Sequence, residues 1–136
     1  MTADNRSGNA TGELTHAGRC LGEARALHAA GFPYGAASRA YYAVFHAARG
    51  LLFSAGIEVR SHHGVTALLG EHFVLSGRLS PELGRLVSRL QRDREDADYV
   101  TGAVFTDAEA AAAVADAERF LAEVRRLLDP AGKDLR

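Results

Sequence analysis

The 136-residue chain has little of what several classes of protein require. It holds a single cysteine, Cys20, and therefore no internal disulfide, which favours a reducing compartment. We expect Cys20 to be a small buried apolar residue on the first helix. No apolar run approaches the ~20 residues of a membrane span, and the N-terminal residues lack the apolar segment of a signal peptide. The sequence therefore predicts a cytoplasmic protein that does not enter a membrane.

Signals for β-strands and for a strong charge imbalance are also missing. β-branched residues are sparse and do not alternate with polar ones over a useful length, which argues against a sheet. The net charge of −1 excludes a globally basic nucleic-acid-binding protein but leaves a local basic patch open. Since 47% of the residues are hydrophobic and 24% are charged, the composition is that of one globular domain with a sizeable core.

Helical spacing and clear helix boundaries are what the chain does contain. Three glycines follow apolar helical runs where left-handed C-terminal caps would lie: Gly31, Gly56 and Gly77. Ser80 precedes Pro81 as a candidate N-cap, and Thr106-Asp107-Ala108-Glu109 matches a capping box. The pattern predicts five helices, at about 12–30, 34–55, 62–76, 80–99 and 107–128.

Long amphipathic helices with short connections predict an all-α fold, an antiparallel up-and-down helical bundle of about five helices. We expect the bundle to span residues 12–129. Residues 1–11 are predicted to form a disordered N-terminal tail and residues 130–136 a C-terminal tail.

One arginine stands where a core residue is expected. In the helix predicted over 80–99, Leu86, Val87 and Leu90 follow an apolar track whose next position is Arg94. A guanidinium keeps its proton, so its unpaired burial is unfavourable. Arg94 therefore needs a partner, and two are open: an ion pair with Asp98 one turn later, or a polar cleft that receives a phosphate.

The helix predicted over 34–55 carries two lines of side chains. A wide apolar face is expected to be buried: Ala37, Tyr41, Val44, Phe45, Ala48, Leu51 and Leu52. Beside it lies a polar line: Arg39, Tyr42, His46 and Arg49. Arginine, tyrosine and histidine suit a partner surface or phosphate contacts, and an ordinary solvated stripe is the alternative.

Basic residues also gather on the fourth predicted helix. Between residues 78 and 94 the chain has five arginines against two carboxylates. Arg85, Arg89 and Arg92 share one helix face, separate from that of Arg94. Because arginine binds phosphate through a bidentate fork, this face is a candidate for RNA or nucleotide contact. A solvated surface is again the alternative.

Motifs for metals and cofactors are weak. A di-iron bundle requires two Glu-x-x-His motifs, and Glu13 with His16 forms the one instance. His62, His63 and His72 lack zinc-ligand spacing, and the first two more simply begin the third helix. No glycine-rich phosphate loop follows a strand. The sequence therefore indicates no metal and no cofactor.

Three blocks of the chain resemble one prokaryotic branch of the HEPN domain family, in the order that family has them. They are Ser38-Arg39-Ala40-Tyr41-Tyr42-Ala43-Val44-Phe45-His46-Ala47-Ala48, Ser61-His62-His63-Gly64-Val65 and Arg94-Glu95-Asp96-Ala97-Asp98-Tyr99. The resemblance implies a helical bundle that forms a homodimer, with the third block of each subunit lining a shared cleft. Many HEPN proteins are metal-independent ribonucleases, and others are partners of small nucleotidyltransferases in toxin–antitoxin pairs.

The chain departs from the nuclease members of that family. Those members have an arginine followed, after four to six residues, by a histidine. Arg94 matches the arginine, but Tyr99 stands five residues later and no histidine follows His72. Tyrosine of ordinary pKa is a poor general base, so whether the chain is an enzyme stays open. Arg39 and His46 have the family spacing on another helix, either by chance or because His46 reaches the same cleft.

Three functions follow. In the first, the chain is an RNA- or nucleotide-binding component of a toxin–antitoxin or nucleotidyltransferase-associated system. Arg94 then holds phosphate, Asp98 orients it, and Tyr99 supplies a hydroxyl or accepts a nucleotide from the partner. In the second, it is a weak metal-independent ribonuclease, with Arg94 stabilising the transition state and His46 or Tyr99 moving protons. In the third, it is a non-catalytic structural dimer.

Overall fold

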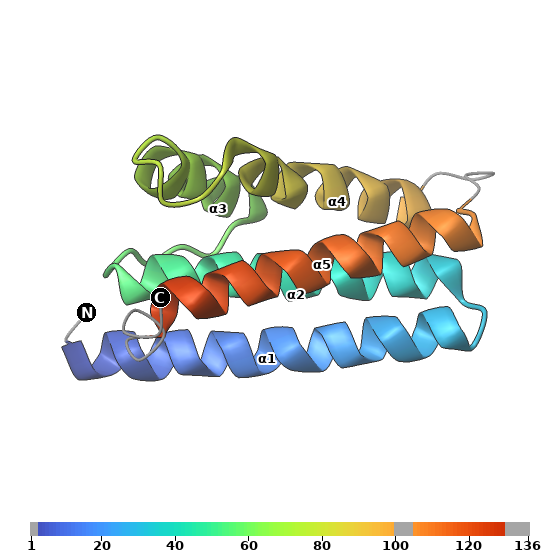
Figure 1. Cartoon of the computed structure of the whole chain (residues 1–136), viewed down its shortest axis with the longest axis horizontal. Helices are drawn as coiled ribbons and strands as arrows, with labels where there is room; N and C mark the ends of the chain where they lie inside the picture. The colour runs from blue at the N-terminus through green and yellow to red at the C-terminus, as the bar shows by residue number, and fades with distance from the viewer. Residues whose placement is uncertain (1–2, 100–104, 130–136) are drawn as a thin grey trace.

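The structure, a computed structural model, describes residues 3–99 and 105–129 (Figure 1). Its elements are α1 (Ala3–Ala29), α2 (Pro33–Ser54), α3 (His62–Leu69), the π-helical turn η1 (Gly70–Val74), α4 (Pro81–Tyr99) and α5 (Asp107–Leu128). The described part of the chain contains no strand. The predicted all-α bundle is therefore confirmed.

The four long helices, α1, α2, α4 and α5, alternate in direction along the chain. In Figure 1, α1 lies on one side of α2 and α5, and α3 and α4 lie on the other. Helix α2 is central, since it packs against α1, α3, α4 and α5. A functional residue on α2 can therefore contact almost any other element.

The core forms around the apolar face of α2, as its spacing predicts. All seven residues of that face are buried: Ala37, Tyr41, Val44, Phe45, Ala48, Leu51 and Leu52. Phe120 and Leu121 of α5, together with Leu86 and Leu90 of α4, pack into the same cluster. Cys20 of α1 is also buried there as a free thiol, and burial raises its pKa.

Most of the predicted helix ends are confirmed. Gly31, Gly56 and Gly77 have φ angles of 85°, 81° and 81°, the left-handed conformation that glycine adopts without strain. The Ser80 hydroxyl accepts a hydrogen bond from the Leu83 amide, at 3.2 Å. Thr106 and Glu109 form the expected reciprocal capping box at the start of α5.

The first helix begins earlier than predicted. The sequence places its start at residue 12, but α1 begins at Ala3, so the described residues of the proposed N-terminal tail are helical. Packing explains this extension. Ala10 is buried, and a Cβ atom at Gly50 of α2 would lie 3.2 Å from the Ala10 carbonyl oxygen. Gly50 on α2 therefore lets α1 approach closely. This packing stabilises the early turns of α1, whose own residues favour a helix only weakly. Residues 130–136, the proposed C-terminal tail, lie outside the described residues.

The third predicted helix changes its winding before it ends. The helix predicted over 62–76 is α-helical to Leu69 and continues as η1 to Val74. The Leu75 amide donates to the Gly70 carbonyl at 3.0 Å, the wider bonding pattern of a π turn.

No helix in the described part of the chain is both long and apolar enough to cross a membrane.

Candidate functional site

Arg94 points into the protein, as the apolar track of α4 predicts. Leu86, Val87 and Leu90 are fully buried along that track, and Arg94 at its next position is only 9% exposed. It is the one buried charged residue in the described part of the chain. A charged group is rarely buried without partners, so its surroundings define the candidate site.

Arg94 is held by one carboxylate and two aromatic rings. Its Nη1 lies 3.2 Å from Oδ2 of Asp98, which confirms the ion pair expected one turn later. Its Cζ lies 5.3 Å from the centre of the Tyr41 ring and 5.6 Å from that of Tyr42, within reach of cation–π attraction. Burial works to lower the pKa of Arg94, but Tyr42, Tyr99 and Asp98 together raise it.

One donor of Arg94 is left without a partner. Its Nε–H is buried and has no hydrogen-bond acceptor among the described residues. Unpaired buried donors are uncommon and costly, so each one calls for an explanation, such as an acceptor supplied by a bound molecule or ion. The guanidinium therefore has hydrogen-bonding capacity that the described part of this chain does not use.

A tyrosine and a histidine complete the surroundings of Arg94. Tyr41 is fully buried, and its hydroxyl is hydrogen-bonded to Nδ1 of His62 from α3. Burial raises the pKa of Tyr41. The pKa of His62 is lowered, first by burial and then by the nearby positive charge of Arg94. Both effects favour the neutral form of the His62 imidazole.

The segment over residues 61–65 explains how His62 reaches this position. The Ser61 hydroxyl caps α3 by accepting from the Gly64 amide at 2.9 Å. A Cβ atom on Gly64 would lie only 2.7 Å from Ser61 Oγ, so the tight cap requires a glycine there. Val65 is buried in the core and anchors the first turn. This local arrangement fixes the ring of His62 beside Phe45, with 4.6 Å between the ring centres.

Helix α1 supplies carboxylates beside the polar line of α2, which is made of Arg39, Tyr42, His46 and Arg49. Arg39 lies 3.4 Å from Glu23, and His46 Nδ1 lies 2.6 Å from Glu13. Arg49 lies 3.0 Å from the other oxygen of Glu13 and donates from Nε to the Val59 carbonyl. Carboxylates of α1 therefore pair with three residues of a line for which the sequence left open a partner or phosphate surface and an ordinary solvated stripe.

The structure brings some of the predicted site residues together and separates others. Arg94, Asp98 and Tyr42 form one cluster. Arg39 lies over the Tyr42 ring at 4.8 Å, and the ring of His46 lies 6.5 Å from that of Tyr42. Tyr99 stands at the outer edge of the cluster with 74% of its surface exposed. Arg49 lies farther along α2 and is linked to His46 through Glu13 of α1, which contacts both.

The arginine face of α4 is partly neutralised. Arg89 forms an ion pair with Asp116 of α5, while Arg85 and Arg92 are exposed. The helix-to-helix pair gives Arg89 a role in packing, so this face is a weaker candidate for phosphate contact than Arg94.

The sequence did not predict the roles of Tyr41, His62 and Glu13. Tyr41 lies on the apolar track of α2, and His62 lies in a HEPN-like block and at a helix start, but neither feature assigns it a hydrogen-bond partner. A signal for Tyr41 was present, because a buried tyrosine hydroxyl needs a hydrogen-bond partner. Its partner lies 21 residues away on another helix, which periodicity does not reveal.

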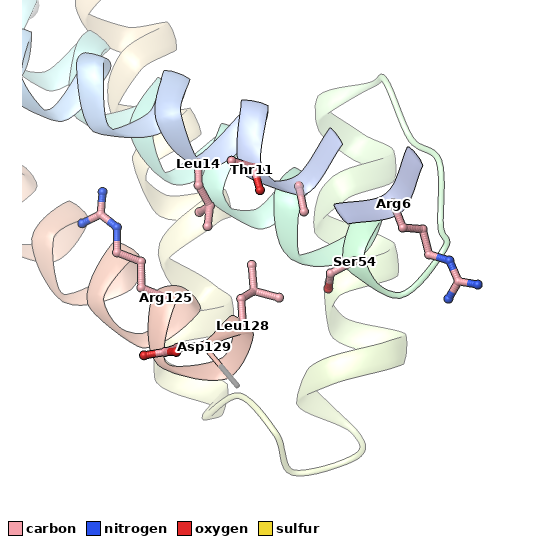
Figure 2. A pocket seen from close by; sticks show the side chains of 8 residues that line it. Arg6, Thr11, Leu14, Ser54, Arg125, Leu128 and Asp129 are labelled. Atoms are coloured by element: carbon pink, nitrogen blue, oxygen red, sulfur yellow. The ribbon is translucent and has the colours of Figure 1, made fainter. Parts of the chain in front are cut away.

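A separate cavity of about 570 Å³ lies between the start of α1 and the ends of α2 and α5 (Figure 2). Leu14 and Leu128 point toward each other across it, whereas the guanidinium of Arg6 points away. None of the predicted site residues lines this cavity.

No group of three or more His, Cys, Asp or Glu side chains able to hold a metal ion occurs among residues 3–99 and 105–129.

Comparison with known proteins gives consistent similarities. The model of the HEPN domain matches residues 13–127. A Methanocaldococcus jannaschii protein named "Putative toxin MJ0605" is 34% identical over 93 residues, 68% of this chain and 69% of that protein. A Thermotoga maritima protein named "UPF0332 protein" is 30% identical over 110 residues, 81% of this chain and 83% of that protein.

Proposed function

The chain belongs to the HEPN family, and we propose that it binds RNA or a nucleotide through a phosphate held by Arg94. In this proposal it is the binding component of a toxin–antitoxin or nucleotidyltransferase-associated system. The name of the M. jannaschii relative supports the toxin part of the proposal.

The observation that carries the proposal is the unused bonding capacity of a buried cation. The Arg94 guanidinium is nine-tenths buried and has one carboxylate partner, and its Nε–H has no acceptor within the described residues. A phosphate oxygen is a strong acceptor for such a group, and its charge would offset the burial of the cation. The low dielectric of the site would strengthen that contact.

Tyr99 and a second subunit extend the proposal. Tyr99 is exposed and its side chain is hydrogen-bonded to Arg94, so it could add a hydroxyl contact beside that arginine or accept a nucleotide added by a nucleotidyltransferase partner. In the homodimer that we propose, the segments over residues 94–99 of the two subunits face one shared cleft. Light scattering that gives the mass of one chain would contradict the shared cleft.

Arg94→Ala should weaken binding of a fluorescently labelled RNA oligonucleotide, or of ATP, by about tenfold to a hundredfold, the range for losing a charged hydrogen bond. Arg94→Lys should give an intermediate loss, because lysine keeps the charge but not the planar fork. Fluorescence anisotropy measures both RNA affinities, and calorimetry measures those for ATP.

The matched control is Arg119→Ala, which removes the same charge from an exposed arginine paired with Glu82 at 2.9 Å. It should change affinity less than twofold or so, since exposed charges act weakly. If Arg94→Ala folds normally and binds both probes as tightly as the wild type, the proposed function is wrong.

A metal-independent ribonuclease is the alternative, and one arrangement favours it. His46 Nδ1 is held at 2.6 Å by Glu13, the pairing of a base with a residue that orients it. The Tyr42 ring lies next to both His46 and Arg94. We expect this alternative to show as cleavage of labelled RNA in EDTA that Glu13→Gln reduces and His46→Ala abolishes. Intact RNA after prolonged incubation would exclude it.

A further inference from the structure

His62 and Arg94 share the same two aromatic rings. The His62 ring centre lies 5.5 Å from that of Tyr41 and 6.3 Å from that of Tyr42. The Arg94 Cζ lies 5.3 Å and 5.6 Å from these same rings. An imidazole from α3 and a guanidinium from α4 therefore both lie near the same pair of tyrosines on α2.

The hydrogen bond to Tyr41 determines which nitrogen of His62 carries the proton. Within the described residues, the Tyr41 hydroxyl has His62 Nδ1 as its hydrogen-bond partner. Because the fully buried Tyr41 hydroxyl has no other acceptor among the described residues, its proton is assigned to the hydrogen bond with Nδ1. A neutral His62 then carries its own proton on Nε2.

The Nε2–H of His62 is available to a ligand. His62 is half-buried, and Nε2 has no hydrogen-bond partner in the described part of the chain. His62 is also the first residue of α3, where the helix dipole favours a negative charge. A neutral ring with Nε2 protonated is a donor, which suits contact with an anion better than removal of a proton.

We infer that His62 is a second phosphate-contacting residue of the Arg94 site, donating from Nε2 while Tyr41 holds its ring in place. This inference rests on the proposed function, because it needs the phosphate that Arg94 is proposed to bind. The ligand chemistry is a phosphate ester, which either RNA or a free nucleotide would supply.

Two substitutions of His62 separate the roles of its two nitrogens. His62→Asn keeps an amide near Nδ1 for Tyr41 but removes the donor at Nε2, so the affinity should fall about tenfold. His62→Gln places an amide N–H near Nε2 and should stay within about threefold of the wild type. His63→Asn, at the exposed neighbouring position, is the matched control and should not change the affinity. Circular dichroism and thermal melting confirm folding.

The probes are a labelled RNA oligonucleotide and ATP, each tested with the His62 variants and with Arg94→Ala. A loss in His62→Asn for both probes supports a contact to phosphate as such, and a loss for RNA alone supports it with RNA as the ligand. If Arg94→Ala binds normally, the proposed function fails and the inference fails with it. If Arg94→Ala loses binding while His62→Asn does not, the inference alone is overturned.

A measurement on the wild-type protein does not depend on how the variants fold. The ¹⁵N chemical shifts of histidine-labelled protein at pH 7.5 report the tautomer of each ring. We expect His62 to be protonated at Nε2, with that signal moving when ATP is added. Protonation at Nδ1 would overturn the inference, and so would an Nε2 signal that stays unchanged at saturating ATP.

Discussion

Phe120→Ala should lower the free energy of unfolding by about 3–5 kcal/mol, the range for removing a buried aromatic side chain. Phe120 is fully buried on α5, in the cluster that joins α5 to α2 and α1. Its removal leaves a cavity that rigid helices fill only in part. Since domains of this size are stable by about 5–15 kcal/mol, the variant should lose a large share of its total stability.

Urea unfolding at 25 °C, followed by circular dichroism, measures this loss. The matched control is Phe32→Ala, because Phe32 is 59% exposed at the turn before α2. The same chemical change there should alter stability by less than about 0.5 kcal/mol. A loss below about 1 kcal/mol in Phe120→Ala would contradict the packing of α5 described above.

Asp98→Ala should change stability and phosphate binding in opposite directions. Without Asp98, the buried Arg94 has no carboxylate, which is expected to destabilise the fold by about 1–3 kcal/mol. The value lies below that for a fully buried pair because the Asp98 side chain is 35% exposed. A phosphate at Arg94 would lose a negative neighbour, so the affinity for RNA should rise roughly threefold to tenfold.

This pair of measurements separates a binding site from a purely structural ion pair. Asp96→Ala removes an exposed carboxylate from the same helix and should change neither quantity beyond about 0.5 kcal/mol. If Asp98→Ala destabilises the protein but leaves RNA affinity unchanged, the Arg94–Asp98 pair serves packing alone. The non-catalytic structural dimer would then be the better hypothesis.

The helices and their boundaries were accessible from sequence because they depend on local physics. Gly77 ends its segment because the left-handed conformation suits glycine. The Thr106–Glu109 capping box forms from residues three apart. The start of α1 was missed because the turns before residue 12 depend on packing: Ala10 lies against Gly50, far away in the sequence.

The same division applies to the candidate site. The inward direction of Arg94 and its bond to Asp98 follow from helical periodicity on a single helix. The pairing of His46 with Glu13 joins residues 33 positions apart, and α1 supplies the carboxylate. A line of polar residues on one helix cannot by itself indicate whether solvent, a partner or a neighbouring helix will face it.

The sequence alone determined the all-α bundle, most of its helix ends and one arginine directed into the core, because helical spacing and capping act within a few residues. Only the tertiary structure decided what surrounds that arginine. The site draws on three separate parts of the chain. The two tyrosines come from α2, the imidazole of His62 from α3, and Arg94 itself from α4. They meet because α2 packs against both α3 and α4, a consequence of burying apolar faces that no single segment specifies.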